Sequence, residues 1–422
     1  MTGVILLGLF LLLVALRVPI AFAMGISTVI SLFLLDVPLD VFFTRVMASV
    51  DSFSLLAIPF FILAGDLLTS GGISDRLIRF ANSVIGWARG GLGMVNVSAS
   101  MLFAGISGSA AADTVAVGGV MIPAMKREGY RPAFASAVTA ASSTIGPLIP
   151  PSVLLILYGG ITGVSISALF LAGIVPGILV GFILLLTAWL IGRKQVGKQS
   201  ELSPRLVGTS MVKAALGLVI PVGLVLGILG GVFTATEGGV VVVVYALIVS
   251  MLVYRELSWR DLGPLLVRSS VMSGVLMVLV AMAAGFAWVL AFARVPQTLL
   301  DAVTGLTTDP TLILLLIVAF LLVFGMFVET IAATIITVPV LFPLGEAAGL
   351  DPIHFAIVVV MALLIGTVTP PLGILLYICA GIANTSVGSA IREVLPFILA
   401  LVAAVLVVAL VPQLATFVPG LA

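Results

Sequence analysis

The residues best suited to binding ions lie at four places where apolar sequence is interrupted. Two places are short segments between apolar runs, Gly105–Ala112 and Gly325–Ile331, and the other two break an apolar run near Gly146 and Gly366. At membrane depth, irregular backbone leaves N–H and carbonyl groups that lipid does not satisfy. Freed carbonyls and hydroxyls are hard oxygen ligands that suit Na⁺, and helix N-termini suit anions. The four places together predict a site for a cation and an anionic substrate.

The candidate ligands divide by their chemistry. We expect substrate contacts from Ser107, Gly108, Ser109, Asp113, Thr144, Pro150, Glu329, Thr330, Thr369 and Pro370. We expect Na⁺ contacts from Gly105, Ser109, Gly146, Pro147, Gly325, Glu329, Gly366, Thr367 and Thr369. For any one of the small residues, close helix packing is an equally good explanation. Packing alone does not require paired interruptions at matched positions, so the set as a whole favours binding.

Three carboxylates at membrane depth have structural alternatives to a functional role. Asp113 begins the second arm of the first segment, where a helix N-cap is the main alternative. Glu329 lies in the second segment without an evident cap role, which favours function. Glu237 precedes an apolar run, where a cap or a hydrogen bond between helices competes with a substrate role.

The interrupted regions are two copies of one unit. When the chain is aligned with itself so that Gly105 falls on Gly325, Gly146 falls on Gly366 and the Pro150–Pro151 pair on Pro370–Pro371, with no gap. With 44 Gly and 22 Pro in 422 residues, chance explains few such ungapped matches. The chain therefore contains a duplication.

Composition limits the class of protein. Hydrophobic residues make up 62% of the chain and charged residues 8%, against about a quarter charged in soluble proteins. Long apolar runs fill nearly the whole length, which predicts an all-α polytopic membrane protein. We interpret the first run, from Val4, as a retained span because no basic stretch precedes it. The net charge of +1 gives no reason to expect a nucleic-acid partner.

The apolar runs suggest which helices cross the membrane. Runs at 92–104 and 113–125 are each about 20 Å long as helix, too short for a ~30 Å hydrocarbon core. We therefore predict re-entrant hairpins and broken spanning helices. The predicted layout is a first repeat over 1–191, with hairpin 1 at 92–125 and a broken helix at 132–161; a cytoplasmic linker at 192–213; and a second repeat over 214–422, with hairpin 2 at 311–345 and a broken helix at 352–383.

The distribution of basic residues orients this layout. With the linker in the cytoplasm, every Lys and Arg except Arg45 and Arg294 falls on the inner side, as the positive-inside rule requires. The two hairpins then enter from opposite sides, so the repeats are inverted. Inverted repeats with interrupted helices are typical of secondary transporters, whose sites lie between the repeats. The side on which the N-terminus lies is left open.

Several motifs resemble one transporter family. They are GISGSAAADTVAVGGVMIPAMKREGY with the following IGPLIPPS, the segment FTATEGG, and GTVTPPLG. The chain is similar over essentially its whole length to the DctM-like large membrane subunit of TRAP (tripartite ATP-independent periplasmic) transporters. It departs from the usual family pattern at Ala235, where Pro is more common.

The resemblance implies more than the residues do. It implies a Na⁺-driven, elevator-type importer of organic acids such as C4-dicarboxylates or sialic acid, in the bacterial inner membrane. Its partners would be a small four-helix membrane subunit on a separate chain, a periplasmic binding protein and membrane lipid. The alternative transporter is a divalent-anion symporter or antiporter that needs no binding protein. An enzyme is disfavoured, because the chain has one His, one Cys and no paired buried Asp motif. No P-loop occurs, so direct ATP drive is unsupported.

Overall fold

The computed structural model describes residues 2–195 and 203–421, and within these ranges the chain is helical with no strand. The helices are α1 (Thr2–Ala15), α2 (Ile20–Leu34), α3 (Asp40–Val50), α4 (Ala57–Ser70), α5 (Ile73–Ile85), α6 (Gly91–Ser107), α7 (Ala110–Arg127), α8 (Pro132–Ser142), α9 (Val153–Thr162), α10 (Ile166–Gly192), α11 (Pro204–Leu229), α12 (Ala235–Leu247), α13 (Trp259–Phe292), α14 (Val295–Thr304), α15 (Pro310–Gly325), α16 (Thr330–Ala347), α17 (Pro352–Gly366), α18 (Ile374–Ala383), α19 (Val387–Leu410) and α20 (Gln413–Thr416). Short helical turns η1 (Phe53–Leu56), η2 (Ser143–Ile145) and η4 (Pro419–Leu421) and the π-helical η3 (Ile248–Val253) complete the set.

Seven of the described helices are long and apolar enough to cross a membrane. They cover Phe53–Ser70, Ile166–Gly192, Pro204–Leu229, Ala235–Val253, Trp259–Phe292, Thr330–Ala347 and Val387–Leu410. The prediction of an all-helical membrane protein with many spans is confirmed at this level.

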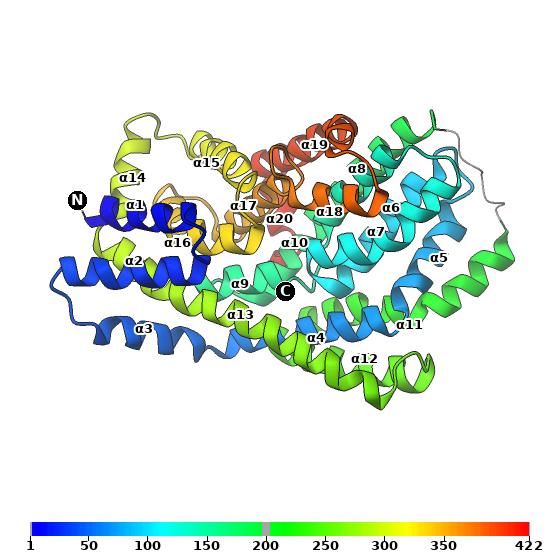
Figure 1. The fold of residues 1–422 in the computed structure, drawn as a ribbon, viewed down its shortest axis with the longest axis horizontal. Helices are drawn as coiled ribbons and strands as arrows, with labels where there is room; N and C mark the ends of the chain where they lie inside the picture. Colours follow the sequence, from blue (N-terminus) through cyan, green and yellow to red (C-terminus); the bar gives the residue numbers. More distant parts are fainter. Residues whose placement is uncertain (1, 196–202, 422) are drawn as a thin grey trace.

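The helix order of the first half recurs in the second. Helices α5 to α10 correspond in order to α14 to α19, and the alignment that places Gly105 on Gly325 also matches α7 to α16 at both ends. Figure 1 shows the α6–α7 pair near α5 and α11 toward one end of the long axis, and α16 near α1 and α14 toward the other. The two hairpins therefore lie toward opposite ends of the molecule, and their entry from opposite sides of a membrane stays a prediction.

In each half of the chain, the second helix of the broken pair packs against helices of the other half. Helix α18, from the second half, packs against α7 and α8 of the first. Helix α9, from the first half, packs against α16 of the second, where the rings of Tyr158 and Phe342 meet edge to face at 6.3 Å. The hairpins and broken helices therefore form one packed body rather than two separate units.

The hairpins turn more tightly than the sequence predicts. Only Gly108 and Ser109 separate α6 from α7, whereas the sequence predicts a tip over Gly105–Ala112. The arms have 17 and 18 residues, so they reach about 25 Å rather than 20 Å. The second tip likewise shrinks to residues 326–329. The physical reason at the first tip is the left-handed conformation of Gly108 (φ 59°), which reverses the chain in one step.

The predicted linker and the stretch between α2 and α4 are also partly helical. The linker predicted at 192–213 overlaps α11, which begins at Pro204 behind the Ser203 cap, and its residues 196–202 lie outside the described ranges. The polar stretch Asp36–Asp51 contains the helix α3, whose buried Phe42 faces α13. Both helices carry polar residues at their ends or on one face. An average of hydropathy over such a segment does not distinguish it from a loop.

Two basic residues that the charge distribution predicts on the cytoplasmic side join distant parts of the chain. Arg131 forms an ion pair with Glu393 at 2.7 Å, and Lys126 donates a hydrogen bond to the carbonyl oxygen of Ala383 at 2.6 Å. Lys126 lies in the last turn of α7 and Ala383 ends α18, so this bond joins hairpin 1 to the second broken helix. A cation at a helix C-terminus also complements the helix dipole.

We expect Lys126→Ala to loosen the contact between α7 and α18. The loss of a charged hydrogen bond at a helix end should cost about 1–2 kcal/mol. The measurement is the apparent melting temperature in detergent at a fixed scan rate. Arg127→Ala is the matched control because the Arg127 side chain is exposed, and equal losses in both variants would contradict the role of the bond.

Candidate functional site

The first tip places a carboxylate inside the protein. Ser109 caps α7 by accepting a hydrogen bond from the backbone N–H of Ala112, so Asp113 is not the cap. Asp113 lies in the first turn of α7, is fully buried, and accepts a hydrogen bond from the Ser107 hydroxyl through Oδ1. Its other oxygen, Oδ2, has no hydrogen-bond partner among the described residues. A buried carboxylate with one unpartnered oxygen is a strong candidate for binding a cation.

The first tip and the first break lie against each other. A Cβ atom built on Gly146 would collide with Asp113 Oδ2, so the carboxylate faces the backbone of the break directly. A Cβ atom on Gly108 would lie 2.5 Å from the carbonyl oxygen of Pro151. Only glycine permits these approaches. The structure therefore brings Gly108, Asp113 and Gly146 close together.

The second tip and the second break are also in contact. A Cβ atom on Gly366 would lie 2.5 Å from the Cα atom of Gly325 and 2.8 Å from its carbonyl oxygen. The two backbones meet without a side chain between them. The second repeat thus juxtaposes its tip and its break, but places no buried carboxylate there among the described residues.

Glu329 plays a different part from the one the sequence suggests. It is the N-cap of α16, and its carboxylate accepts hydrogen bonds from the backbone N–H groups of Ile331 and Ala332 at 2.9 and 3.2 Å. The expectation that Glu329 has no cap role is wrong, because α16 begins directly after it. Glu237 also belongs to a helix start, in a capping box with Thr234. The cap is therefore the right interpretation of Glu237.

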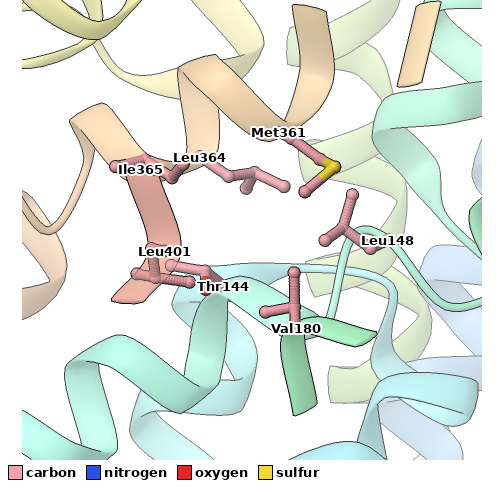
Figure 2. Close-up of a pocket in the computed structure, with 7 residues that line it drawn as sticks. All are labelled: Thr144, Leu148, Val180, Met361, Leu364, Ile365 and Leu401. Atoms are coloured by element: carbon pink, nitrogen blue, oxygen red, sulfur yellow. The ribbon is translucent and has the colours of Figure 1, made fainter. Parts of the chain in front are cut away.

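The two breaks line one narrow cavity of about 10 Å³ (Figure 2). Its walls are Thr144, Leu148, Val180, Met361, Leu364, Ile365 and Leu401. Thr144 and Leu364 occupy the same position in the two repeats, each two residues before the glycine of its break. Because these equivalent residues line the same cavity, the two breaks face each other. The volume is just enough for one water molecule, and apart from Thr144 the walls are apolar side chains.

The hydroxyl groups at the breaks present oxygen lone pairs. Thr144 donates its proton to the carbonyl of Ala141, Thr367 to Leu364 and Thr369 to Ile365, at 2.6–2.7 Å. Because each proton is used within the helix, the hydroxyl oxygen remains an acceptor. An oxygen in this state suits a cation better than an anion.

A sequence profile described as "Tripartite ATP-independent periplasmic transporter, DctM component" matches residues 7–414. The chain belongs to the DctM family. Among its relatives, the C4-dicarboxylate TRAP transporter large permease protein DctM of Pseudomonas aeruginosa is 38% identical over 88% of this chain and 87% of its own length. The sialic acid TRAP transporter large permease protein SiaM of Vibrio cholerae is 38% identical over 89% of this chain and 88% of its own.

The fold has solved counterparts at low sequence identity. The YdaH transporter of Alcanivorax borkumensis superposes with a TM-score of 0.66 at 17% identity, and the match covers 88% of both chains. Membership of the DctM family makes this chain the large permease component of a three-part, ATP-independent transporter in the bacterial inner membrane. The predicted family and location are confirmed.

The remaining candidate residues of this DctM permease surround the tips and breaks. Gly105 lies inside α6, where a Cβ atom would be 2.5 Å from Pro221 of α11, so close helix packing explains it well. The Pro147 carbonyl already accepts a hydrogen bond from Ser152 at 2.5 Å. Thr330 begins α16 and is buried. Pro150 and Pro370 each precede a cis peptide bond within a break.

The sequence interpretation missed a group of polar residues in the permease. Asn96 and Ser100 lie on α6, and Thr139 and Ser142 on α8, all fully buried. Their spacing of four and three residues puts each pair on one helix face, which is the signal that could have revealed them. All four residues lie outside the interrupted segments from which the candidate ligands were predicted.

Proposed function

We propose that this permease imports an organic acid anion by coupling its movement to Na⁺. The proposed substrates are C4-dicarboxylates, sialic acid or similar acids, delivered by a periplasmic binding protein. A small four-helix membrane subunit on a separate chain completes the complex. The C4-dicarboxylate and sialic acid permeases among its relatives support this substrate class.

One observation carries the Na⁺ coupling. The buried Asp113 carboxylate faces the backbone at Gly146, and its Oδ2 atom has no partner among the described residues. No Lys or Arg lies within the tip or the break of this repeat, so a bound cation is the natural counter-charge. We assign Asp113 to the cation rather than to the anionic substrate, because two negative groups in a dry site repel.

The helix starts suit the substrate's negative charge. Ser109 and Ser152 are the N-caps of helices α7 and α9, next to the tip and the break, and helix N-termini carry partial positive charge. A Na⁺ ion at Asp113 would lower the repulsion further. Binding of ion and anion would then be mutually favourable, which is what coupling requires.

We also propose that the hairpins and broken helices move as one body against α4, α11, α12 and α13. The contacts between these groups near the first tip involve small or rigid residues, because Gly65 approaches the backbone of Ser107 and Gly105 approaches Pro221. Surfaces without long interlocking side chains can slide with little steric resistance. The inverted relation of the repeats would let the same body face either side.

Transport by reconstituted vesicles tests the proposal. The complex of this permease with its small subunit is placed in vesicles, and uptake of radiolabelled succinate or sialic acid is followed with the cognate binding protein outside. We expect accumulation with an inward Na⁺ gradient and only background uptake with an equal K⁺ gradient. Equal uptake in both gradients would overturn Na⁺ coupling. Uptake that persists without the binding protein would favour the self-sufficient symporter or antiporter instead.

A further inference from the structure

Four polar side chains meet inside the first repeat where α6 packs on α8. Asn96 Nδ2 donates a hydrogen bond to Thr139 Oγ1 at 2.7 Å, and Ser142 Oγ donates one to Asn96 Oδ1 at 3.3 Å. The hydroxyl oxygens of Ser100 and Ser142 are 2.8 Å apart. All four side chains have no exposed surface. Every oxygen and nitrogen of the group therefore has a partner within the protein.

This polar group, formed by Asn96, Ser100, Thr139 and Ser142, lies directly before the first break. Ser142 is the last residue of α8, and the next residue, Ser143, donates a hydrogen bond to the carbonyl of Thr139 at 2.8 Å. Gly146, which faces Asp113, follows within one turn. The polar group thus ties the end of α8 to hairpin 1 just where the break begins.

The second repeat has nothing equivalent. The four matching positions in the second repeat are Leu316, Phe320, Val359 and Ala362, none of which carries a polar side-chain atom, and Leu316 and Phe320 are about half exposed. Helices α15 and α17 nevertheless pack closely. Apolar contact is therefore enough to hold a hairpin against a broken helix in this fold. The hydrogen bonds of the first repeat need a different explanation. The buried Asp113 carboxylate, which only this repeat carries among the described residues, supplies one.

We propose that Asn96 is a positioning residue for the cation site. Through Thr139 and Ser142 it fixes the last turn of α8 on α6, and so holds Gly146 opposite Asp113. A binding site works only when its ligands are held within about 0.5 Å of their positions. Directional hydrogen bonds fix how far α8 can slide or turn against α6, whereas apolar contact alone leaves this register free. This inference rests on the proposed Na⁺ coupling and adds a second set of residues to it.

Replacing Thr139 tests the hydrogen bonds separately from packing. Thr139→Val keeps the shape and removes the hydroxyl, whereas Thr139→Ser keeps the hydroxyl and removes a methyl group that lies against Gly118. We expect the Na⁺ concentration for half-maximal uptake to rise about tenfold in Thr139→Val and in Asn96→Leu, with a smaller change in maximal rate. Thr139→Ser should stay within about twofold of wild type. A larger defect in Thr139→Ser than in Thr139→Val would overturn the proposal.

Two further measurements separate this inference from the proposed function. Val359→Ala, at the position equivalent to Thr139, should lower the melting temperature without shifting the Na⁺ dependence, because its effect is on packing alone. Hydrogen exchange of residues 139–149 should be faster in Thr139→Val than in Thr139→Ser. Unchanged exchange overturns the positioning role itself. Wild-type uptake that is independent of Na⁺ overturns the proposed function, even where exchange shows the expected change.

Discussion

Asp113→Asn is expected to abolish Na⁺-driven uptake while leaving the permease folded. The amide has nearly the shape of the carboxylate and still accepts the hydrogen bond from Ser107. It lacks the negative charge that we propose binds Na⁺ opposite Gly146. Removing one partner of a buried charge pair costs about 2–5 kcal/mol, so Na⁺ affinity should fall by about 30-fold or more.

Stability in the absence of Na⁺ should move in the other direction. A buried carboxylate with an unpartnered oxygen destabilises a protein until an ion occupies the site. We therefore expect Asp113→Asn to melt at the same or a higher temperature than wild type in K⁺ buffer. Wild type should gain stability as Na⁺ is added, by about 2.7 kcal/mol at one hundred times the dissociation constant, and the variant should gain none.

The matched control for this experiment is Asp75→Asn. Asp75 lies exposed in the first turn of α5, away from the tips and breaks. It should keep both the uptake and the Na⁺-dependent stabilisation. A normal Na⁺ response in Asp113→Asn would show that this carboxylate is not a ligand, and would remove the main support for the proposed coupling.

Much of the fold could be predicted from the sequence because the helices of a membrane protein stand out as apolar runs. Apolar runs mark the helices, Gly and Pro mark the interruptions, and the duplication supports both assignments because each is made twice. The sequence places the breaks close to where the structure has them: α8 and α9 flank Gly146, and α17 and α18 flank Thr367–Gly373. The inverted arrangement of the repeats remains a prediction from charge.

The roles of the two tip carboxylates could not be read in this way. Ser109 and Asp113 are both good helix caps, and only the tight turn at Gly108 decides that Ser109 caps α7. Asp113 is thereby moved onto the buried face of the first turn. At the second tip the turn is longer and ends on Glu329, which becomes the cap. Glu329 holds the position equivalent to Ser109, and Ala333 the position equivalent to Asp113, so the second repeat keeps the cap but has no carboxylate in the first turn of its helix.

Gly366→Ala is expected to separate the second tip from the second break. The added Cβ atom would lie 2.5 Å from the Cα atom of Gly325 and 2.8 Å from its carbonyl oxygen. Both atoms belong to backbone, so no side chain can move aside. Overpacking of this kind costs about 1–3 kcal/mol. We expect at least a roughly tenfold loss of uptake, because α15 and α17 must shift apart at the point where the site is assembled.

A graded series of three glycines makes this expectation specific. Gly381, in α18 of the same broken helix, has open space around it, and Ala there should be neutral or stabilise the helix by up to about 1 kcal/mol. Gly325→Ala should be intermediate, since its Cβ atom would lie 3.0 Å from the carbonyl oxygen of Leu363 and 3.2 Å from the Cα atom of Gly366. Uptake and melting temperature should therefore fall in the order Gly381→Ala, Gly325→Ala, Gly366→Ala. If Gly366→Ala behaves like Gly381→Ala, the tip and the break are not in contact in the working permease, and the second repeat contributes to transport in some other way than by joining the two.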